Sequence, residues 1–183
     1  MSVLPWFLLG GWILTRKTTG PAPAGSPAGG FTGKRYKAGT PEQIALFTAA
    51  AQGAGLPVEW ASDPALQFIL QKESLNGWVG IPNYLWAKYL NTTSTKMWAD
   101  PDSWLKVWNV IKAGNAKPSY TGITSHAVGL GQMQPTNMKL YYPDGIQGCG
   151  DPYNEAVGML RYIAARYGTP AKAREYWEAN QWY

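Results

Sequence analysis

The stretch DPALQFILQKES, residues 63–74, combines a helix start, an apolar stripe and a carboxylate. Asp63 can accept a hydrogen bond from a free backbone N–H of the first turn, and Pro64 suits the first helical position. Three apolar residues follow at the spacing that places side chains on one face of a helix. They are Leu66, Ile69 and Leu70. The sequence therefore predicts an α-helix over residues 64–74 with one buried face.

Glu73 lies seven residues after Leu66, on the same helix face as the apolar stripe. Burial on that face would disfavour the charged carboxylate and raise its pKa. The result would be a group that donates a proton near neutral pH, which a glycosidase needs to protonate the oxygen of the leaving sugar. The same residues also fit a helix that ends here and turns Glu73 to solvent, and periodicity alone favours neither arrangement.

Four more helix starts have the same form, in which proline follows an oxygen-bearing residue. They are Thr40-Pro41, Asp100-Pro101, Asp151-Pro152 and Thr169-Pro170. They predict helices over residues 41–51, 101–111, 152–167 and 170–178. No stretch alternates regularly enough to predict a core of strands. We therefore expect a mainly α fold, with loops rich in Gly and Asn at residues 76–83 and 141–150.

The composition fits one ordinary globular domain with a short appendage. The chain has 183 residues, of which 45% are apolar, and it carries a net charge of +5. Its cations are scattered and match no nucleic-acid-binding motif, so we expect no nucleic-acid partner. The ten Trp and eleven Tyr either fill the core or line a groove, since aromatic rings with polar edges suit sugar rings.

Cysteine and histidine each occur once, as Cys149 and His126. Together they could form a thiol nucleophile and its base, but a buried structural thiol and a histidine that flanks a helix are the simpler interpretation. Zinc hydrolases usually bind their metal through several His or Cys ligands. We therefore expect neither a metal nor another cofactor.

The N-terminal region differs from the rest of the chain. Residues 1–15 are uncharged and mostly apolar, and Arg16 and Lys17 follow at once. This stretch is shorter than the roughly 17–20 residues of a full membrane span, and no basic residue precedes it as in a signal peptide. We favour an uncleaved membrane anchor over a signal-peptide core or a flap that packs on the domain. Residues 16–39, rich in Gly, Pro and Ala, predict a flexible linker.

Three segments resemble, in order, motifs of the soluble lytic transglycosylases, which have a lysozyme-like fold. QKES (71–74) resembles the Glu-Ser motif at the end of their catalytic helix. SHAVGLGQMQP (125–135) is similar to their Ser-x-x-Gly-x-x-Gly-Leu-Met-Gln-x-x-Pro segment, and NEAVGMLRY (154–162) to their Asn-x-x-x-Gly-x-x-x-Tyr helix. The resemblance covers residues 40–183, and the last residues are similar to the ends of lysozyme-like domains in phage virion proteins.

The resemblance implies roles for the matching residues. Glu73 would act first as the acid and then as the base, and Ser74 would help to hold the substrate or the acid. Gln132 and the backbone near Met133 would bind sugar in a groove. Tyr162 would form a hydrogen bond with the Glu73 carboxyl.

Other positions are supporting or depart from the family pattern. Asn154 would have a structural or supporting role. Gly131 stands where many members have Met, so the contact that this Met would make is either lost or supplied by Met133. The later Ala-Tyr-Asn-x-Gly segment of the family is absent, and residues 176–180 are only loosely similar to it, which leaves one wall of the groove unassigned.

The count of carboxylates bears on the reaction. Lysozyme-type hydrolysis uses two carboxylates that flank the bond, and no second acid stands near Glu73 in the sequence. Asp144 and Asp151 qualify only if loops bring them close, and Asp151 already serves as a helix cap. The resemblance thus implies a lytic transglycosylase that cleaves MurNAc-GlcNAc bonds of peptidoglycan and leaves 1,6-anhydro-muramyl ends. The alternatives are a hydrolytic muramidase on the same fold and a non-catalytic structural or wall-binding virion component.

The position of the basic residues relative to the predicted anchor indicates on which side of a membrane such an enzyme would work. Arg16 and Lys17 follow the apolar stretch, so the positive-inside tendency would leave the N-terminus outside and the domain inside. That is unusual for a wall enzyme in a cell and less so for a virus particle with an internal membrane. We therefore expect a membrane-associated protein of a virion or of the bacterial envelope.

Overall fold

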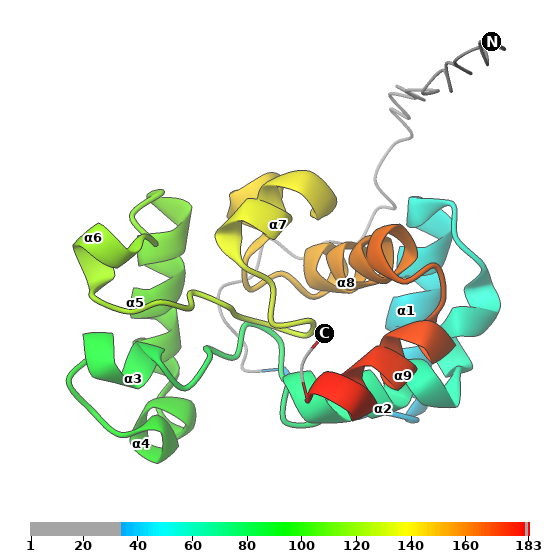
Figure 1. Cartoon of the computed structure of the whole chain (residues 1–183), viewed down its shortest axis with the longest axis horizontal. Coiled ribbons are helices and arrows are strands. Elements are labelled where there is room, and N and C mark those ends of the chain that lie inside the picture. Colours follow the sequence, from blue (N-terminus) through cyan, green and yellow to red (C-terminus); the bar gives the residue numbers. More distant parts are fainter. Residues whose placement is uncertain (1–33, 182) are drawn as a thin grey trace, which may run out of the picture.

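The computed structural model describes residues 34–181 and residue 183, so the predicted anchor and residues 16–33 of the predicted linker lie outside it. The described part is mainly helical, as predicted (Figure 1). Strand pairing within it is limited to isolated bridges, namely Arg35 with Trp78, Pro82 with Val128, and Val128 with Met133. Over the same residues, no helix has the length and apolar character needed to cross a membrane.

All five predicted helices are present, and each begins at its predicted proline. They are α1 (Pro41–Ala54), α2 (Pro64–Glu73), α5 (Pro101–Lys112), α8 (Pro152–Arg166) and α9 (Pro170–Asn180). In each case the side chain of the preceding Thr or Asp accepts a hydrogen bond from a backbone N–H of the first turn. A cap of this kind contributes about 0.5–2 kcal/mol to helix stability.

Shorter helices, which the sequence did not predict, fill the connections. They are η1 (Val58–Ser62), α3 (Trp86–Tyr89), α4 (Ser94–Ala99), α6 (Pro118–Thr121), α7 (Pro135–Tyr141) and η2 (Gly145–Gly148). Each has four to seven residues. One or two turns are too short to show helical periodicity, and tertiary packing stabilises such segments more than their own propensity does.

The helices form two groups, each around its own hydrophobic core (Figure 1). Helices α1, α2, α8 and α9 enclose the first core, where Phe47 and Leu66 are fully buried. Helices α3, α4, α5 and α7 contribute most of the second, which contains Trp86 and Ile111, and Tyr162 of α8 also packs there. The loop at residues 125–134 joins the two groups, because its Val128 packs in the second core and its Leu130 in the first. This loop therefore has a fixed position relative to both.

The folded domain begins earlier than the predicted boundary at residue 40. Tyr36 is buried in the first core, and its backbone N–H donates to the carbonyl of Gly77 at 2.7 Å. The carbonyl of Lys34 accepts a hydrogen bond from Val79 at 3.2 Å, and the backbone N–H of Ala38 donates to the side chain of Asn76. Residues 34–39 are thus part of the domain, where they brace the loop after α2, and the linker prediction is wrong for them.

Candidate active site

Glu73 is the last residue of α2, at the end of the buried stripe that the sequence predicts. Its side chain is half-buried, so the helix does not turn it into bulk solvent. The indole Nε1–H of Trp177, on α9, donates to Glu73 Oε1 at 2.7 Å. Desolvation raises the pKa of Glu73 to about 7, and the hydrogen bond from Trp177 acts in the opposite direction. Near neutral pH this group therefore exists both as an acid and as a carboxylate, as a general acid that later becomes a base requires.

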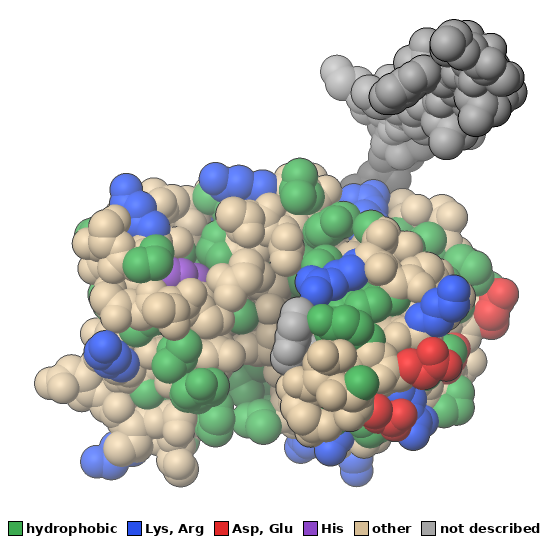
Figure 2. All heavy atoms as spheres, viewed as in Figure 1, with side chains coloured by type: hydrophobic (Ala, Val, Ile, Leu, Met, Phe, Trp, Pro, Cys, Tyr) green, Lys and Arg blue, Asp and Glu red, His purple; other side chains and the backbone are tan. Residues whose placement is uncertain are grey.

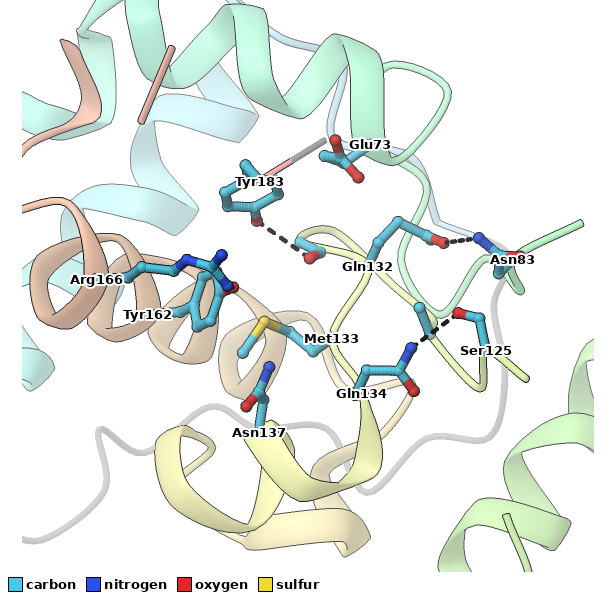
Figure 3. Close-up of a pocket in the computed structure, with 12 residues that line it drawn as sticks. Glu73, Asn83, Ser125, Gln132, Met133, Gln134, Asn137, Tyr162, Arg166 and Tyr183 are labelled. Atoms are coloured by element: carbon cyan, nitrogen blue, oxygen red, sulfur yellow. Dashed lines mark hydrogen bonds between the residues drawn. The ribbon is translucent and has the colours of Figure 1, made fainter. Parts of the chain in front are cut away.

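Glu73 lines a pocket of about 380 Å³ that takes residues from both helix groups (Figure 3). This volume lies within the range of about 300–1,000 Å³ usual for small-molecule sites. Most of the polar lining groups are neutral amides and hydroxyls, which can donate to and accept from sugar hydroxyls. The lining residues are Glu73, Asn83, Ser125, Ala127, Gly131, Gln132, Met133, Gln134, Asn137, Tyr162, Arg166 and Tyr183.

Gln132 and Met133 both line this pocket, and the backbone holds them in place. Gln132 has a positive φ of 43°, a conformation that is strained for a residue with a side chain. Its Nε2 donates to the carbonyls of Ile81 at 3.1 Å and Gly129 at 3.2 Å. Met133 is buried, and its backbone pairs with Val128 in both directions. These contacts fix the amide of Gln132 at the pocket wall before any ligand binds.

Tyr162 lines the same pocket. In the part of the chain that the structure describes, its hydroxyl is not hydrogen-bonded to Glu73 as the resemblance implies. It accepts a hydrogen bond from Arg166, one turn later on α8. The ring of Tyr162 packs edge-on against Tyr183, with centroids 5.6 Å apart. The hydrogen bond that the structure describes for the Glu73 carboxyl comes instead from the indole of Trp177, on α9.

Ser74 is fully buried and lies outside the residues that line the pocket. Its hydroxyl donates to the carbonyl of Leu70 at 2.7 Å and accepts from the backbone N–H of Gly77 at 2.9 Å. Of the two roles that the resemblance implies for Ser74, holding the substrate or holding the acid, this position fits the second. Both hydrogen bonds secure the turn that follows Glu73, so Ser74 supports the acid through the backbone.

Asn154 does not line the pocket, and its contacts are with the backbone and side chains next to α8. It is buried, its Oδ1 accepts from the backbone N–H of Asp144 at 2.8 Å, and its Nδ2 donates to the carboxylates of Asp144 at 2.9 Å and Asp151 at 3.0 Å. These bonds tie the loop before α8 to the first turn of that helix. Neither aspartate is among the residues that line the pocket, so neither stands beside Glu73 as a second carboxylate.

Glu155, which the motifs did not single out, is fully buried. Its Oε2 accepts from the backbone N–H groups of Gly80 at 3.0 Å and Leu130 at 2.9 Å, and its Oε1 accepts from that of Gly150 at 2.9 Å. Desolvation raises its pKa to about 7, although these three hydrogen bonds lower it. The carboxylate therefore fastens together three loops, one of which carries Gln132.

There is a steric explanation for glycine at position 131, where many lytic transglycosylases have Met. A Cβ on Gly131 would lie 2.6 Å from the hydroxyl oxygen of Tyr183 and 3.1 Å from Cγ of Met159. The Tyr183 hydroxyl donates to the carbonyl of Gly131 at 3.1 Å, and both residues line the pocket. A Met at position 131 would collide with Tyr183, so Tyr183 and Met133 supply the wall there.

Cys149 and His126 have structural surroundings. Cys149 is buried, and burial raises the pKa of its thiol well above the usual value, which disfavours the reactive thiolate. Nε2 of His126 shares a hydrogen bond of 2.6 Å with the hydroxyl of Thr121, and its ring packs edge-on against Trp86. Neither residue lines the pocket.

Several pocket residues were not predicted from the motifs. Ser125 and Gln134 lie inside the matching segment 125–135, and Arg166 follows Tyr162 by four residues on the same helix face, which is the signal that could have found it. Comparison of the chain with protein-family models, with curated proteins and with solved structures gives no match. The function is therefore inferred from the pocket and from its chemistry.

Proposed function

We propose that this chain is a lytic transglycosylase, which cleaves the bond between MurNAc and GlcNAc in peptidoglycan. The observation that carries the proposal is the state of Glu73, a half-buried carboxyl group with a pKa raised to about 7 at the wall of a pocket lined by neutral amides. Such a group supplies a proton to a glycosidic oxygen at neutral pH, and its carboxylate form then accepts one. The surrounding amides suit the hydroxyl and acetamido groups of the sugars.

The reaction has two steps, and Glu73 serves in both. The protonated carboxyl gives its proton to the oxygen that joins C1 of MurNAc to C4 of GlcNAc, and the C1–O bond breaks. The carboxylate then takes the proton from the C6 hydroxyl of the same MurNAc, whose oxygen bonds to C1. The products are a free C4 hydroxyl and a 1,6-anhydro-muramyl end. Glu73 returns to its protonated form and no water is consumed.

The carboxylate count supports this reaction over the hydrolytic alternative. A muramidase of the two-carboxylate type uses a second carboxylate that faces the bond. Among the described lining residues, Glu73 is the one carboxylate. Asp144 and Asp151 are hydrogen-bonded to Asn154. The hydrogen bonds described for the Glu155 carboxylate come from backbone N–H groups, and Glu155 is not among the described lining residues.

The proposed setting is a membrane-associated protein of a virion or of the bacterial envelope, which opens the wall locally. It rests on the apolar residues 1–15 and the Gly- and Pro-rich segment after them, both of which lie outside the described residues.

The proposal is tested by turnover on purified peptidoglycan with wild type, Glu73→Gln and a control, Glu59→Gln, whose side chain is exposed and lies outside the pocket. The amide keeps the shape of Glu73 and an oxygen for Trp177 but has no transferable proton. Loss of general acid–base catalysis costs about a hundredfold to ten-thousandfold in rate, and because one group serves both steps we expect at least the upper part of that range. A wild type as inert as Glu73→Gln would refute the proposal and favour a wall-binding component.

A further inference from the structure

Arg166, the last residue of α8, places a guanidinium at the wall of the pocket that contains Glu73. Figure 3 shows Arg166 beside Tyr162 at one end of the pocket, with Asn83 and Ser125 at the other end. Nothing in the reaction proposed above uses this cation, because the acid and the base are both Glu73. Its position raises the question of which group of a substrate it meets.

Aromatic contacts hold the guanidinium in place. It donates from Nη1 to the hydroxyl of Tyr162. Its Cζ lies 5.7 Å from the ring centre of Tyr162, 5.4 Å from that of Tyr167 and 5.5 Å from that of Tyr176. A guanidinium packed against aromatic rings loses less side-chain entropy when it binds a ligand, and its planar donors match a carboxylate. The side chain is exposed, so a ligand in the pocket can reach it.

The charge of the pocket points to an anion. Arg166 and Glu73 are the two residues of formal charge in the described lining. Glu73 is neutral in the form that starts the reaction, so the lining then carries a net positive charge. The remaining polar groups are amides and hydroxyls, which do not offset it. A pocket of this kind favours a substrate with one negative group at the end where Arg166 lies.

We propose that Arg166 binds a carboxylate carried on the lactyl arm of the muramyl residue, and so makes the site prefer charged muramyl strands to uncharged ones. This inference rests on the proposed function. Of the two sugars in the strand, MurNAc alone bears a lactyl ether. Its carboxyl group is either free or joined to a stem peptide that has carboxylates of its own. Both sources present the same chemistry on the same side of the sugar, and the experiment separates them.

The experiment compares kcat/KM on three substrates: peptide-free glycan strands, the same strands with the lactyl carboxyl reduced to an alcohol, and strands that keep their stem peptides. The proteins are wild type, Arg166→Gln, Arg166→Lys and a control, Lys172→Gln. The control removes one positive charge from an exposed residue of α9 that does not line the pocket. Thermal unfolding of each variant verifies that the fold is intact.

Wild type is expected to cleave carboxylate strands about tenfold better than reduced ones, the usual size of a charge-assisted hydrogen bond at a partly hydrated site. Arg166→Gln should lose this preference, so that it cleaves carboxylate and reduced strands about equally well, and Lys172→Gln should behave as wild type. Arg166→Lys keeps the charge, so it should retain more of the preference than Arg166→Gln. A loss confined to stem-bearing strands would place the bound carboxylate on the peptide, and a loss on peptide-free strands would place it on the lactyl group.

Two results would overturn the assignment. An equal loss by Arg166→Gln on all three substrates would mean that Arg166 acts through the fold, and no loss on any would mean that it does not meet the substrate. Failure of the proposed function has a different signature, since wild type would then release no fragments from any strand. In that case, equilibrium binding on the Glu73→Gln background still tests Arg166, and equal affinity for charged and reduced strands would refute its role.

Discussion

Glu73→Gln should make the protein more stable than wild type, and increasingly so as the pH rises. The unfolded chain releases the Glu73 proton above a pKa of 4.5, while the native protein holds it until about 7. Between these values the unfolded state binds fewer protons, so the free energy of unfolding of wild type falls as the pH rises. A neutral amide does not titrate and therefore avoids this loss, while the side chain of Glu155 contributes equally to both proteins.

The magnitude follows from the size of the pKa rise. A rise from 4.5 to about 7 corresponds to about 3 kcal/mol, at about 1.4 kcal/mol per pKa unit. Glu73 is only half-buried, and solvent screening reduces this to about 1–2 kcal/mol. For a chain of this size, about 1 kcal/mol shifts Tm by about 2–4 °C. The Tm difference between Glu73→Gln and wild type should therefore grow by about 3–6 °C between about pH 5 and about pH 8.

The assay is thermal unfolding of wild type, Glu73→Gln and the exposed control Glu59→Gln, each at both pH values. The control should show the same difference from wild type at both. A Tm difference for Glu73→Gln that is unchanged between the two pH values would refute the reasoning. It would mean that the native carboxyl titrates near its ordinary pKa and is not poised to donate a proton at neutral pH.

Three further substitutions test the contacts around the pocket. Trp177→Phe removes the donor that lowers the pKa of Glu73, so the alkaline limb of the pH–rate profile should move to higher pH and kcat should fall about tenfold; an unmoved limb would contradict this. In Glu155→Gln an amide NH2 would face a backbone N–H that one carboxylate oxygen now accepts, and this clash outweighs the gain from removing a buried titrating group. Chemical denaturation at neutral pH should therefore show a loss of about 2–4 kcal/mol, and a loss below about 1 kcal/mol would contradict the role of Glu155 in joining the three loops. Ser74→Ala should cost about 1–2 kcal/mol of stability with KM unchanged, and a raised KM would restore its predicted role in substrate binding.

The sequence predicts the long helices well because their boundaries depend on local chemistry. An oxygen-bearing cap followed by proline satisfies the first-turn N–H groups within a few residues. Asp63 and Asp151 show this most clearly, since each accepts the bond that its position predicts. The short elements depend on tertiary packing instead. Trp86, for example, is fully buried within the four-residue helix α3, a position that no periodic pattern could indicate.

The sequence predicts only part of the candidate site. The contacts that it does not predict involve side chains from segments far apart in the chain. The stripe that ends at Glu73 is local, and so is the turn that carries Gln132. The partner of Glu73 is not local, because Trp177 lies 104 residues away and the arrangement of α2 and α9 decides the contact. The role of Glu155 is also largely non-local, since two of its three partners, Gly80 and Leu130, lie 75 and 25 residues away in the chain.

The central claim is that Glu73 works alone, and the masses of the products test it most directly. Wild type acting on purified peptidoglycan should yield fragments that end in 1,6-anhydro-muramyl residues, each one water lighter than a fragment with a reducing end. Asp144→Asn and Asp151→Asn should give the same products, apart from a modest loss of stability where Asp151 caps α8. Reducing ends in place of anhydro ends, with either Asp variant as inactive as Glu73→Gln, would instead identify a two-carboxylate muramidase and contradict the account.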